Sequence, residues 1–283
     1  MEVRALSWNL FHGRDHPPEP ELSTWRSRLL RTTERGPRHA QVNTDLRAAF
    51  ESVIAGAGWD VLLLQECPPR WAERLATACD ADAHLVPTSR NLPLLGRLQA
   101  SIADRNPDLI ASWEGGSNLT LVRRAAAITE RRSLRLATRP ERRAMAFTRL
   151  GADLCIANLH ASAERAQAER ELPAAARAAA EWARGTPLIL GGDFNLRPAL
   201  SGRVFTRIEA EHGLRAPTGE RIIDHLLAAG LEIAEPACQW PPERREVADP
   251  TARPSRPALP IRLSDHAPVE ALFRTVGGPA AAP

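Results

Sequence analysis

The chain has 283 residues, of which 43% are hydrophobic and 25% are charged, and its formal net charge is +3. This composition is typical of a folded globular protein and excludes a disordered chain, a collagen-like repeat and a low-complexity scaffold. No apolar run reaches the roughly 18 to 20 residues that cross a bilayer, and the N-terminus lacks the features of a signal peptide, so we expect a cytoplasmic protein.

Strand-like and helical segments alternate along the chain. The strand-like segments, in chain order, are residues 3–10, 60–65, 118–122, 144–150, 154–159, 187–191, 222–227 and 268–273. Helical patterns cover residues 25–33, 44–57, 68–78 and 163–183, and Pro173 should kink the last helix or start a second one. We expect a hairpin around Gly151, because two strand-like segments flank it closely. The mixture predicts an α/β domain in which helices cover at least one sheet.

The chain shows no repeat of fixed period and no long polar linker. Pro-rich stretches lie at residues 17–20 and 236–260. They predict insertion-like surface loops near residues 12–43 and 236–262 rather than a linker between two domains. We therefore expect one domain over residues 1–276, followed by a flexible tail at residues 277–283.

Cysteines and basic residues do not by themselves indicate a site. Cys67, Cys79, Cys155 and Cys238 form no C-x-x-C pair, so their spacing suggests neither a zinc site nor a disulfide framework. Every basic residue counted as lysine or arginine is an arginine, and tyrosine is absent. Because this composition is biased, the net positive charge is a weak argument for an anionic partner.

Polar side chains recur at or near one end of the apolar strand-like segments. A buried carboxylate is costly unless it is paired or bound to a metal, so a core strand has no structural reason to carry one repeatedly. We take these residues as candidates for a functional site; they are Asn9, Glu66, His160, Asp193, Asn195, Asp224, Asp265 and His266.

Each candidate taken alone also has a structural interpretation. Asn9 suits a turn, residues 193–195 suit an Asx-type turn, and Glu66 suits a solvated strand end. His160 suits a hydrogen-bonded core histidine, and Asp265 suits a cap. The functional interpretation depends on the ordered set.

That ordered set resembles the endonuclease/exonuclease/phosphatase superfamily, which includes deoxyribonuclease I. The combination of Gly-Asp-Phe-Asn with a terminal Ser-Asp-His is highly specific, and the resemblance extends from Trp8 to Val269. The matching motifs are Ser7-Trp8-Asn9-Leu10, Leu64-Gln65-Glu66, Asn158-Leu159-His160, Gly191-Gly192-Asp193-Phe194-Asn195, Ile223-Asp224-His225 and Ser264-Asp265-His266-Ala267-Pro268-Val269.

The resemblance implies a four-layer α/β/β/α sandwich of two packed mixed sheets with outer helices, and a site at one end of the sandwich. It further implies that Glu66 binds a divalent metal, with Asn9 and Asp265 close by. A hard cation held by oxygen ligands neutralises an anionic phosphodiester and stabilises the developing charge. Mg²⁺ suits carboxylate and amide ligands, and Mn²⁺ is the alternative.

The resemblance also implies roles for the remaining motif residues. Asp193 and Asn195 would align the attacking water and a phosphate oxygen, and His160 would face the phosphate. Asp224 would orient His266, because a carboxylate fixes the tautomer of a histidine that it accepts a hydrogen bond from. The sequence leaves open whether Asp193 or His266 takes the proton of the water.

Two further residues resemble family contacts to the substrate phosphate. Asn118 follows Gly115-Gly116-Ser117 at the start of a strand-like segment, where a simple turn is the alternative. Arg143 lies in an arginine-rich stretch, where a solvated strand face is the alternative.

These features indicate a metal-dependent phosphoesterase that hydrolyses phosphodiester bonds, with nucleic acid as the leading substrate. A phospholipid, as in sphingomyelinases, or a small phosphate ester is the alternative substrate. Without any tyrosine the chain does not match the apurinic-site endonucleases of the superfamily, whereas His160 matches the deoxyribonuclease I pattern. The other class of function is an inactive relative that binds nucleic acid or protein. We expect a monomer without a membrane span.

Overall fold

The structure is a computed structural model of the chain and describes residues 1–283 apart from 89–104, 110–114, 124–125, 139–141, 254–257 and 276–283. The predicted tail at residues 277–283 lies outside the described residues. Of the helices in the described ranges, none is long and apolar enough to cross a bilayer.

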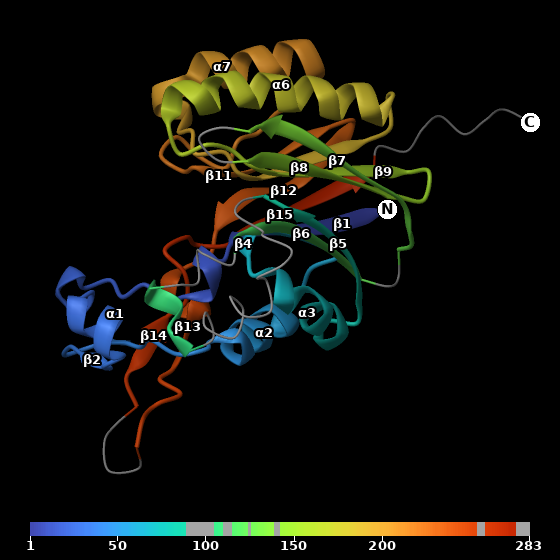
Figure 1. The fold of residues 1–283 in the computed structure, drawn as a ribbon. Coiled ribbons are helices and arrows are strands. Elements are labelled where there is room, and N and C mark those ends of the chain that lie inside the picture. The colour runs from blue at the N-terminus through green and yellow to red at the C-terminus, as the bar shows by residue number, and fades with distance from the viewer. Residues whose placement is uncertain (89–104, 110–114, 124–125, 139–141, 254–257, 276–283) are drawn as a thin grey trace, which may run out of the picture.

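Two mixed β-sheets pack face to face at the centre of the molecule (Figure 1). The six-stranded sheet consists, in spatial order, of β12 (Leu231–Gln239), β15 (Val269–Thr275), β1 (Glu2–Asn9), β4 (Val61–Cys67), β6 (Ser117–Arg123) and β5 (Ala81–Pro87). The five-stranded sheet consists of β11 (Asp224–Ala229), β10 (Leu188–Asp193), β9 (Leu154–His160), β8 (Arg143–Leu150) and β7 (Ile128–Ala137). β1 is parallel to β4 and β9 is parallel to β10, whereas the other neighbours are antiparallel.

Helices cover the outer face of each sheet. α2 (Arg47–Gly56) and α3 (Ala72–Ala78) pack on the six-stranded sheet, and α6 (Arg165–Ala183) and α7 (Pro198–His212) pack on the five-stranded sheet. The architecture is therefore the four-layer α/β/β/α sandwich that the family resemblance implied. α6 continues as one helix through Pro173. The hairpin predicted around Gly151 joins β8 to β9.

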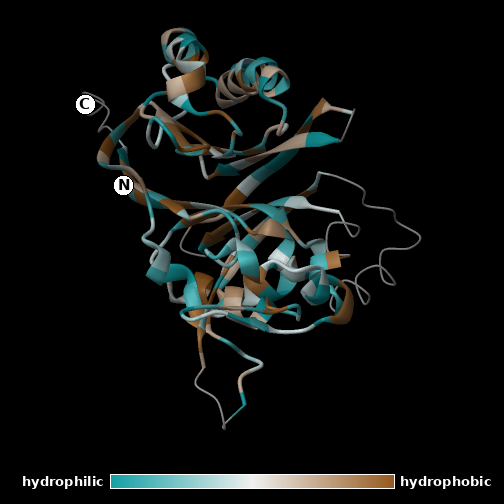
Figure 2. Ribbon diagram, turned by 90° about the vertical axis from the view of Figure 1, so that its left-hand side faces the viewer, coloured by the Kyte–Doolittle hydropathy of each residue, from teal (hydrophilic) through white to brown (hydrophobic). Residues whose placement is uncertain are grey.

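Three apolar clusters hold the layers together. Trp8, Phe50 and Trp71 pack between the six-stranded sheet and its helices, with ring centroids 5.1 and 5.5 Å apart. Residues such as Leu63 and Ile156 fill the space between the two sheets. A third cluster lies under α6 and α7. Because β4 is buried on both faces, its sequence is a continuous apolar run, and Figure 2 shows such hydrophobic stretches in the strands.

Both predicted insertions contain regular elements and contact each other. The first contains α1 (Trp25–Leu30), β2 (Glu34–Arg35) and β3 (Ala40–Gln41). The second contains β13 (Glu246–Ala248) and β14 (Pro260–Arg262). Asp15 forms a β-bridge with Leu263, and Arg35 Nη1 lies 2.9 Å from Asp249 Oδ2. The two insertions thus form one substructure at one end of the sandwich (Figure 1).

The strands β5, β7 and β12 and the helix α7 were not predicted. β7 lies at the edge of its sheet and carries arginines on a largely exposed surface, so no apolar alternation marks it. α7 begins at Pro198 and contains Gly202, and glycine lowers helix propensity. The predicted strand at 222–227 is shifted in the structure to Asp224–Ala229.

A buried polar network joins the two sheets between the apolar clusters. Gln65 Nε2 on β4 donates to Asn158 Oδ1 on β9 at 2.8 Å. Asn158 Nδ2 donates in turn to the carbonyls of Leu64 and Leu119 at 3.2 Å each. Gln65 and Asn158 are fully buried. Because an unpaired buried amide is costly, these contacts specify how one sheet is positioned on the other.

We expect Asn158→Ala to lower the free energy of unfolding by about 2 to 4 kcal/mol. The substitution removes one partner of the Gln65 amide and the donor to the buried carbonyls of Leu64 and Leu119, at about 1 to 3 kcal/mol for each group left unsatisfied. Urea unfolding measures the change. The control is Ser133→Ala at an exposed position of β7, which should stay within about 0.5 kcal/mol. Equal stability of the two variants would contradict the proposed importance of the network.

Candidate active site

The strand topology brings the candidate residues together at one end of the sandwich. In β10, Asp193 lies directly across from His160 of β9 on one side and from Asp224 of β11 on the other. β1 and β4 are parallel, so Asn9 and the Glu66 that ends the β4 run meet at the same edge. β15 is antiparallel to β1, and the residues before it therefore return to this edge.

Asp193 lies at the centre of the site. Its Oδ2 accepts a hydrogen bond from Asn9 Nδ2 at 3.0 Å, and its Oδ1 accepts one from the backbone N–H of Asn195 at 3.0 Å. Burial, together with the charge of Asp224, raises the pKa of Asp193 to about 7. Asp193 can therefore exchange a proton near neutral pH, despite the hydrogen bonds that favour its ionised form.

His266 is held by Asp224 through a hydrogen bond of 2.8 Å between Nδ1 and Oδ2. Burial lowers the pKa of His266, but the charge and hydrogen bond of Asp224 and the charges of Asp193 and Asp265 outweigh it and raise the pKa to about 10. His266 is thus cationic at neutral pH and donates its Nδ1 proton to Asp224. Its Nε2 lies 3.9 Å from Asp193 Oδ2.

The loop that carries Asp265 and His266 is held by several hydrogen bonds. Ser264 has a left-handed backbone, with a φ of 60°, and its Oγ donates to the Asn9 carbonyl at 2.6 Å and accepts from the His266 N–H at 3.0 Å. Trp8 Nε1 donates to the His266 carbonyl at 3.0 Å. Arg245 Nη1 donates to the carbonyls of Leu263 and Ser264, at 2.7 and 2.6 Å.

Glu66 lies at the end of β4 with a left-handed backbone, with a φ of 48°. Its Oε2 is 3.3 Å from His12 Nε2, and its Oε1 is 3.8 Å from His160 Nε2. Burial and the negative charge of Asp265 raise the pKa of Glu66. The repulsion shows that the two carboxylates lie close enough to interact.

His160 and Arg143 lie in contact with each other. Both were predicted from the sequence to face the substrate phosphate. Arg143 Nη1 lies 3.3 Å from His160 Nδ1, and His160 Nε2 lies 3.5 Å from Asp193 Oδ2. Burial and the positive charges of Arg143, His266 and His12 lower the pKa of His160. His160 is therefore neutral, and it accepts from Arg143 and directs its N–H toward Asp193.

Asn118 and Asn195 have amide groups engaged with the backbone. Asn118 Nδ2 donates to the carbonyls of Ala144 and Asn158, at 2.8 and 3.2 Å, and the residue is fully buried. Asn195 Nδ2 donates to the Ala161 carbonyl at 3.1 Å. A contact of Asn118 with the substrate phosphate stays a prediction.

The donor set fits a hard divalent cation. Asn9, Glu66 and Asp265 offer amide and carboxylate oxygens, and the like charges of Glu66 and Asp265 would be neutralised by a cation. Among the described residues, ligand atoms of Asp193, Asp224 and His266 also lie within 4.8 Å of one another. The Oδ1 of Asp224 is buried without a hydrogen-bond partner.

The two potential ligand sets differ in chemistry. In the group of Asp193, Asp224 and His266, the imidazole is protonated and already hydrogen-bonded, so it is a poor ligand. The predicted set of Asn9, Glu66 and Asp265 consists of oxygen donors alone. Mg²⁺ prefers such donors, and we therefore favour the predicted set.

Two residues near the site were not predicted. His12 approaches Glu66 as described, and the charges of Asp108, Glu66 and Asp265 all act on Arg14, whose pKa is lowered by burial. Both belong to the first turns after β1, where Phe11, His12 and Gly13 have positive φ values of 49°, 55° and 80°. Their closeness to Asn9 in the sequence was the feature from which they could have been predicted.

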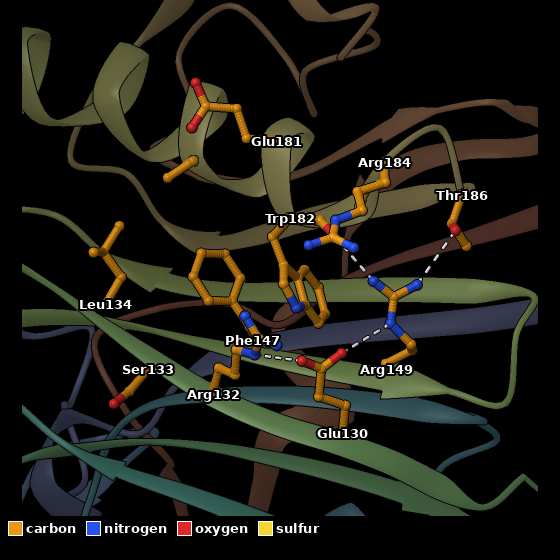
Figure 3. A pocket seen from close by; sticks show the side chains of 12 residues that line it. Glu130, Arg132, Ser133, Leu134, Phe147, Arg149, Glu181, Trp182, Arg184 and Thr186 are labelled. Carbon is orange, nitrogen blue, oxygen red and sulfur yellow. Dashed lines mark hydrogen bonds and ion pairs between the residues drawn. The ribbon is translucent and has the colours of Figure 1, made fainter.

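A separate cavity of about 650 Å³ lies between β7, β8 and the end of α6 (Figure 3). Arg149 spans it, with Nε 3.1 Å from Glu130 Oε2 and Nη2 3.0 Å from the Trp182 carbonyl. The Arg149 guanidinium also lies over the Trp182 ring, 4.9 Å from its centroid. This cavity contains none of the candidate residues.

Comparisons with known proteins agree with the fold and the motifs. A family model described as the Endonuclease/Exonuclease/phosphatase family matches residues 6–266. No curated protein sequence matches the chain. An endonuclease/exonuclease/phosphatase family protein from Bacteroides thetaiotaomicron is 14% identical, with a TM-score of 0.62 over 96% of this chain and 95% of that one.

Two other solved structures share the fold. The mannosyl-6-phosphatase of Bacteroides thetaiotaomicron is 15% identical, with a TM-score of 0.60 over 96% of this chain and 99% of that one. Truncated TDP2 of Caenorhabditis elegans is 16% identical, with a TM-score of 0.57 over 97% and 98%. At these identities the similarity establishes the fold alone.

We expect the Asp193 carboxylate to make the metal-free protein less stable as pH rises. Its pKa of about 7 in the folded state exceeds the ordinary value of 3.8, so ionisation is harder in the folded than in the unfolded chain. The wild type should therefore lose stability relative to Asp193→Asn as pH rises from about 4 to about 7, with no further loss above that range.

Urea unfolding in EDTA at a series of pH values measures this difference. The control is Asp153→Asn, at an exposed position of the turn between β8 and β9. A constant difference between wild type and Asp193→Asn across the series would show that burial does not raise the pKa of Asp193.

Proposed function

Because the chain belongs to the endonuclease/exonuclease/phosphatase family, we propose that it is a metal-dependent phosphoesterase that hydrolyses phosphodiester bonds of nucleic acid. One observation carries this proposal. Asp193, with a pKa near 7, lies beside a cationic His266 that is oriented by Asp224, and Glu66 lies at the same strand edge. This arrangement offers a proton acceptor, a phosphate-facing cation and metal ligands in one place.

In the proposed reaction, Asp193 accepts a proton from the attacking water. A general base works best when its pKa is close to the operating pH, and a pKa of about 7 meets this condition. His266 is already protonated, so it is suited to stabilise the negative charge on the phosphate rather than to take a proton. Of the two bases that the sequence left open, we therefore propose Asp193.

His160 and Arg143 are proposed to position the phosphate. The neutral imidazole of His160 is held by Arg143 on one side and approaches Asp193 on the other. Glu66, Asp265 and Asn9 would hold the divalent cation. When bound, Mg²⁺ or Mn²⁺ neutralises phosphate charge and stabilises the charge that develops as the ester bond breaks.

Nucleic acid as substrate is supported by the match of His160 to the deoxyribonuclease I pattern. We also propose that the protein acts as a cytoplasmic monomer. The test is a panel of single- and double-stranded DNA, RNA, sphingomyelin, sugar phosphates and bis-(p-nitrophenyl) phosphate, each with Mg²⁺ and with EDTA. Hydrolysis of a lipid or sugar phosphate without any hydrolysis of nucleic acid would reject the proposed substrate and retain the phosphoesterase.

We expect Glu66→Gln to weaken metal binding by about tenfold or more, because the variant keeps the size of the side chain but removes one negative ligand charge. Titration of activity with Mn²⁺ should show a higher half-saturating concentration. Glu73→Gln, at an exposed position of α3, is the control and should titrate as the wild type does. Full turnover by a metal-stripped wild type in EDTA would reject the metal requirement.

We expect Asp193→Asn and His266→Ala each to lower kcat by at least about a hundredfold, because positioned acids and bases typically contribute about 10² to 10⁴ in rate. Their melting temperatures should stay near or above that of the wild type, since functional residues often cost stability. The control is His212→Ala, in the last turn of α7. Variants that melt several degrees earlier and keep most of their activity would show that the two residues are structural.

A further inference from the structure

Helix α1 exposes its apolar side chains to solvent, unlike an ordinary surface helix. A surface helix normally turns its apolar face to the core and its polar face to water. In α1 the buried residue is Ser27, whereas Trp25, Leu29 and Leu30 are 62%, 58% and 62% exposed. Packing against the core therefore does not explain why α1 carries these apolar side chains.

Polar contacts hold α1 in this orientation. The Thr24 side chain caps the helix by accepting from the Ser27 N–H at 3.1 Å. Ser27 Oγ hydrogen-bonds to Gln41 and, at 3.2 Å, to Asp108. Asn43 Nδ2 donates to the Ser27 carbonyl at 2.9 Å. Because these groups are paired on the inner side, the apolar side chains are directed outward by the fold and not by fraying of the helix.

A second segment adds to the exposed apolar surface. Asn106 Nδ2 donates to the Arg28 carbonyl at 2.8 Å, which places this segment against α1. Leu109, three residues later, is 44% exposed. We call the exposed side chains of Trp25, Leu29, Leu30 and Leu109 the α1 patch. Within the described residues, the other large exposed hydrophobics are Met1 and Leu200.

The exposed charges on α1 itself are positive, whereas the acidic side chains that contact it, Glu34 and Asp108, accept hydrogen bonds from Thr24 and Ser27. Arg26, Arg28 and Arg31 are exposed, and residues 24–33 contain no acidic side chain. A short helix with tryptophan and leucine on its surface and arginine between them has the composition of an interfacial segment, in which the apolar side chains enter the acyl boundary and the cations meet anionic headgroups.

We propose that the α1 patch binds the surface of an anionic lipid bilayer. Leucine side chains favour this occupant over nucleic acid, because bases stack on aromatic rings and gain little from aliphatic ones. The three arginines disfavour a second copy of the chain, because an α1-to-α1 contact would bring like charges together. This inference concerns binding and goes beyond the proposed hydrolytic activity.

The α1 patch lies at the same end of the molecule as the candidate active site. β1 runs from the N-terminus toward the end where α1 protrudes (Figure 1). Arg14, at the start of the same insertion, accepts a hydrogen bond from Ser264 N–H through its carbonyl at 2.9 Å. Binding through α1 would therefore bring the active-site end of the sandwich close to the bilayer.

The test is sedimentation of the full chain with vesicles of phosphatidylcholine alone and of an equimolar mixture with phosphatidylglycerol, in EDTA so that the result does not depend on hydrolysis. We expect binding to the anionic vesicles only, weakened by salt. The double variant Leu29→Ser, Leu30→Ser should bind more than about tenfold more weakly, because burying one leucine is worth about a tenfold change in an equilibrium constant. The matched control, Leu200→Ser, changes a leucine of 60% exposure on α7 and should bind as the wild type does.

Tryptophan fluorescence provides a second measurement that needs no destabilising variant. Among the tryptophans of the described residues, Trp25 alone is exposed, so anionic vesicles should shift the emission to the blue, and the shift should be lost in Trp25→Phe. Absence of wild-type binding, or equal binding by the α1 and Leu200 variants, would overturn the proposal. Dimerisation without vesicles, or binding to a DNA oligonucleotide, would also overturn the proposal if it depended on Leu29 and Leu30.

Discussion

The hydrogen bonds of Gln65 and Asn158 that link the two sheets are the constraint on which the site depends. They join the two sheets one residue before Glu66 in β4 and two residues before His160 in β9. Apolar side chains between sheets can pack in several registers, whereas a buried amide pair is satisfied in only one. The network therefore determines which strand ends of the two sheets face each other, and hence how the site is assembled.

Burial and mutual charge then give the site residues different protonation states. Asp193 and Asp224 lie across from each other in adjacent strands, and of the two Asp224 is the one that hydrogen-bonds to His266. Burial and repulsion by the charge of Asp224 make Asp193 take up a proton more readily, whereas Asp224 accepts the Nδ1 hydrogen of His266. The same repulsion makes the metal-free site unfavourable for folding, so a bound cation would stabilise the protein as well as serve the reaction.

The two insertions support this site from outside the sandwich. Arg245, from the second insertion, holds the carbonyls just before Asp265, and Arg14, from the first, holds Ser264 through its own carbonyl. Asp15 pairs with Leu263 between them. The loop that carries His266 is thus positioned by segments that the sequence shows only as Pro-rich interruptions, and the same substructure presents α1 to solvent.

The sequence by itself determined the buried strands and the set of strand-end candidates, because strands buried on both faces are continuous apolar runs that polar residues end abruptly. The four-layer fold followed from the resemblance of its motifs to the family. Only the tertiary structure decided that Asp193 is central, that Asn118 is engaged with backbone carbonyls, and that the edge strand β7 exists. The pKa of a carboxylate and the exposure of α1 depend on neighbours that are distant in the chain. Local sequence patterns do not predict those neighbours, since long-range packing alone brings them together.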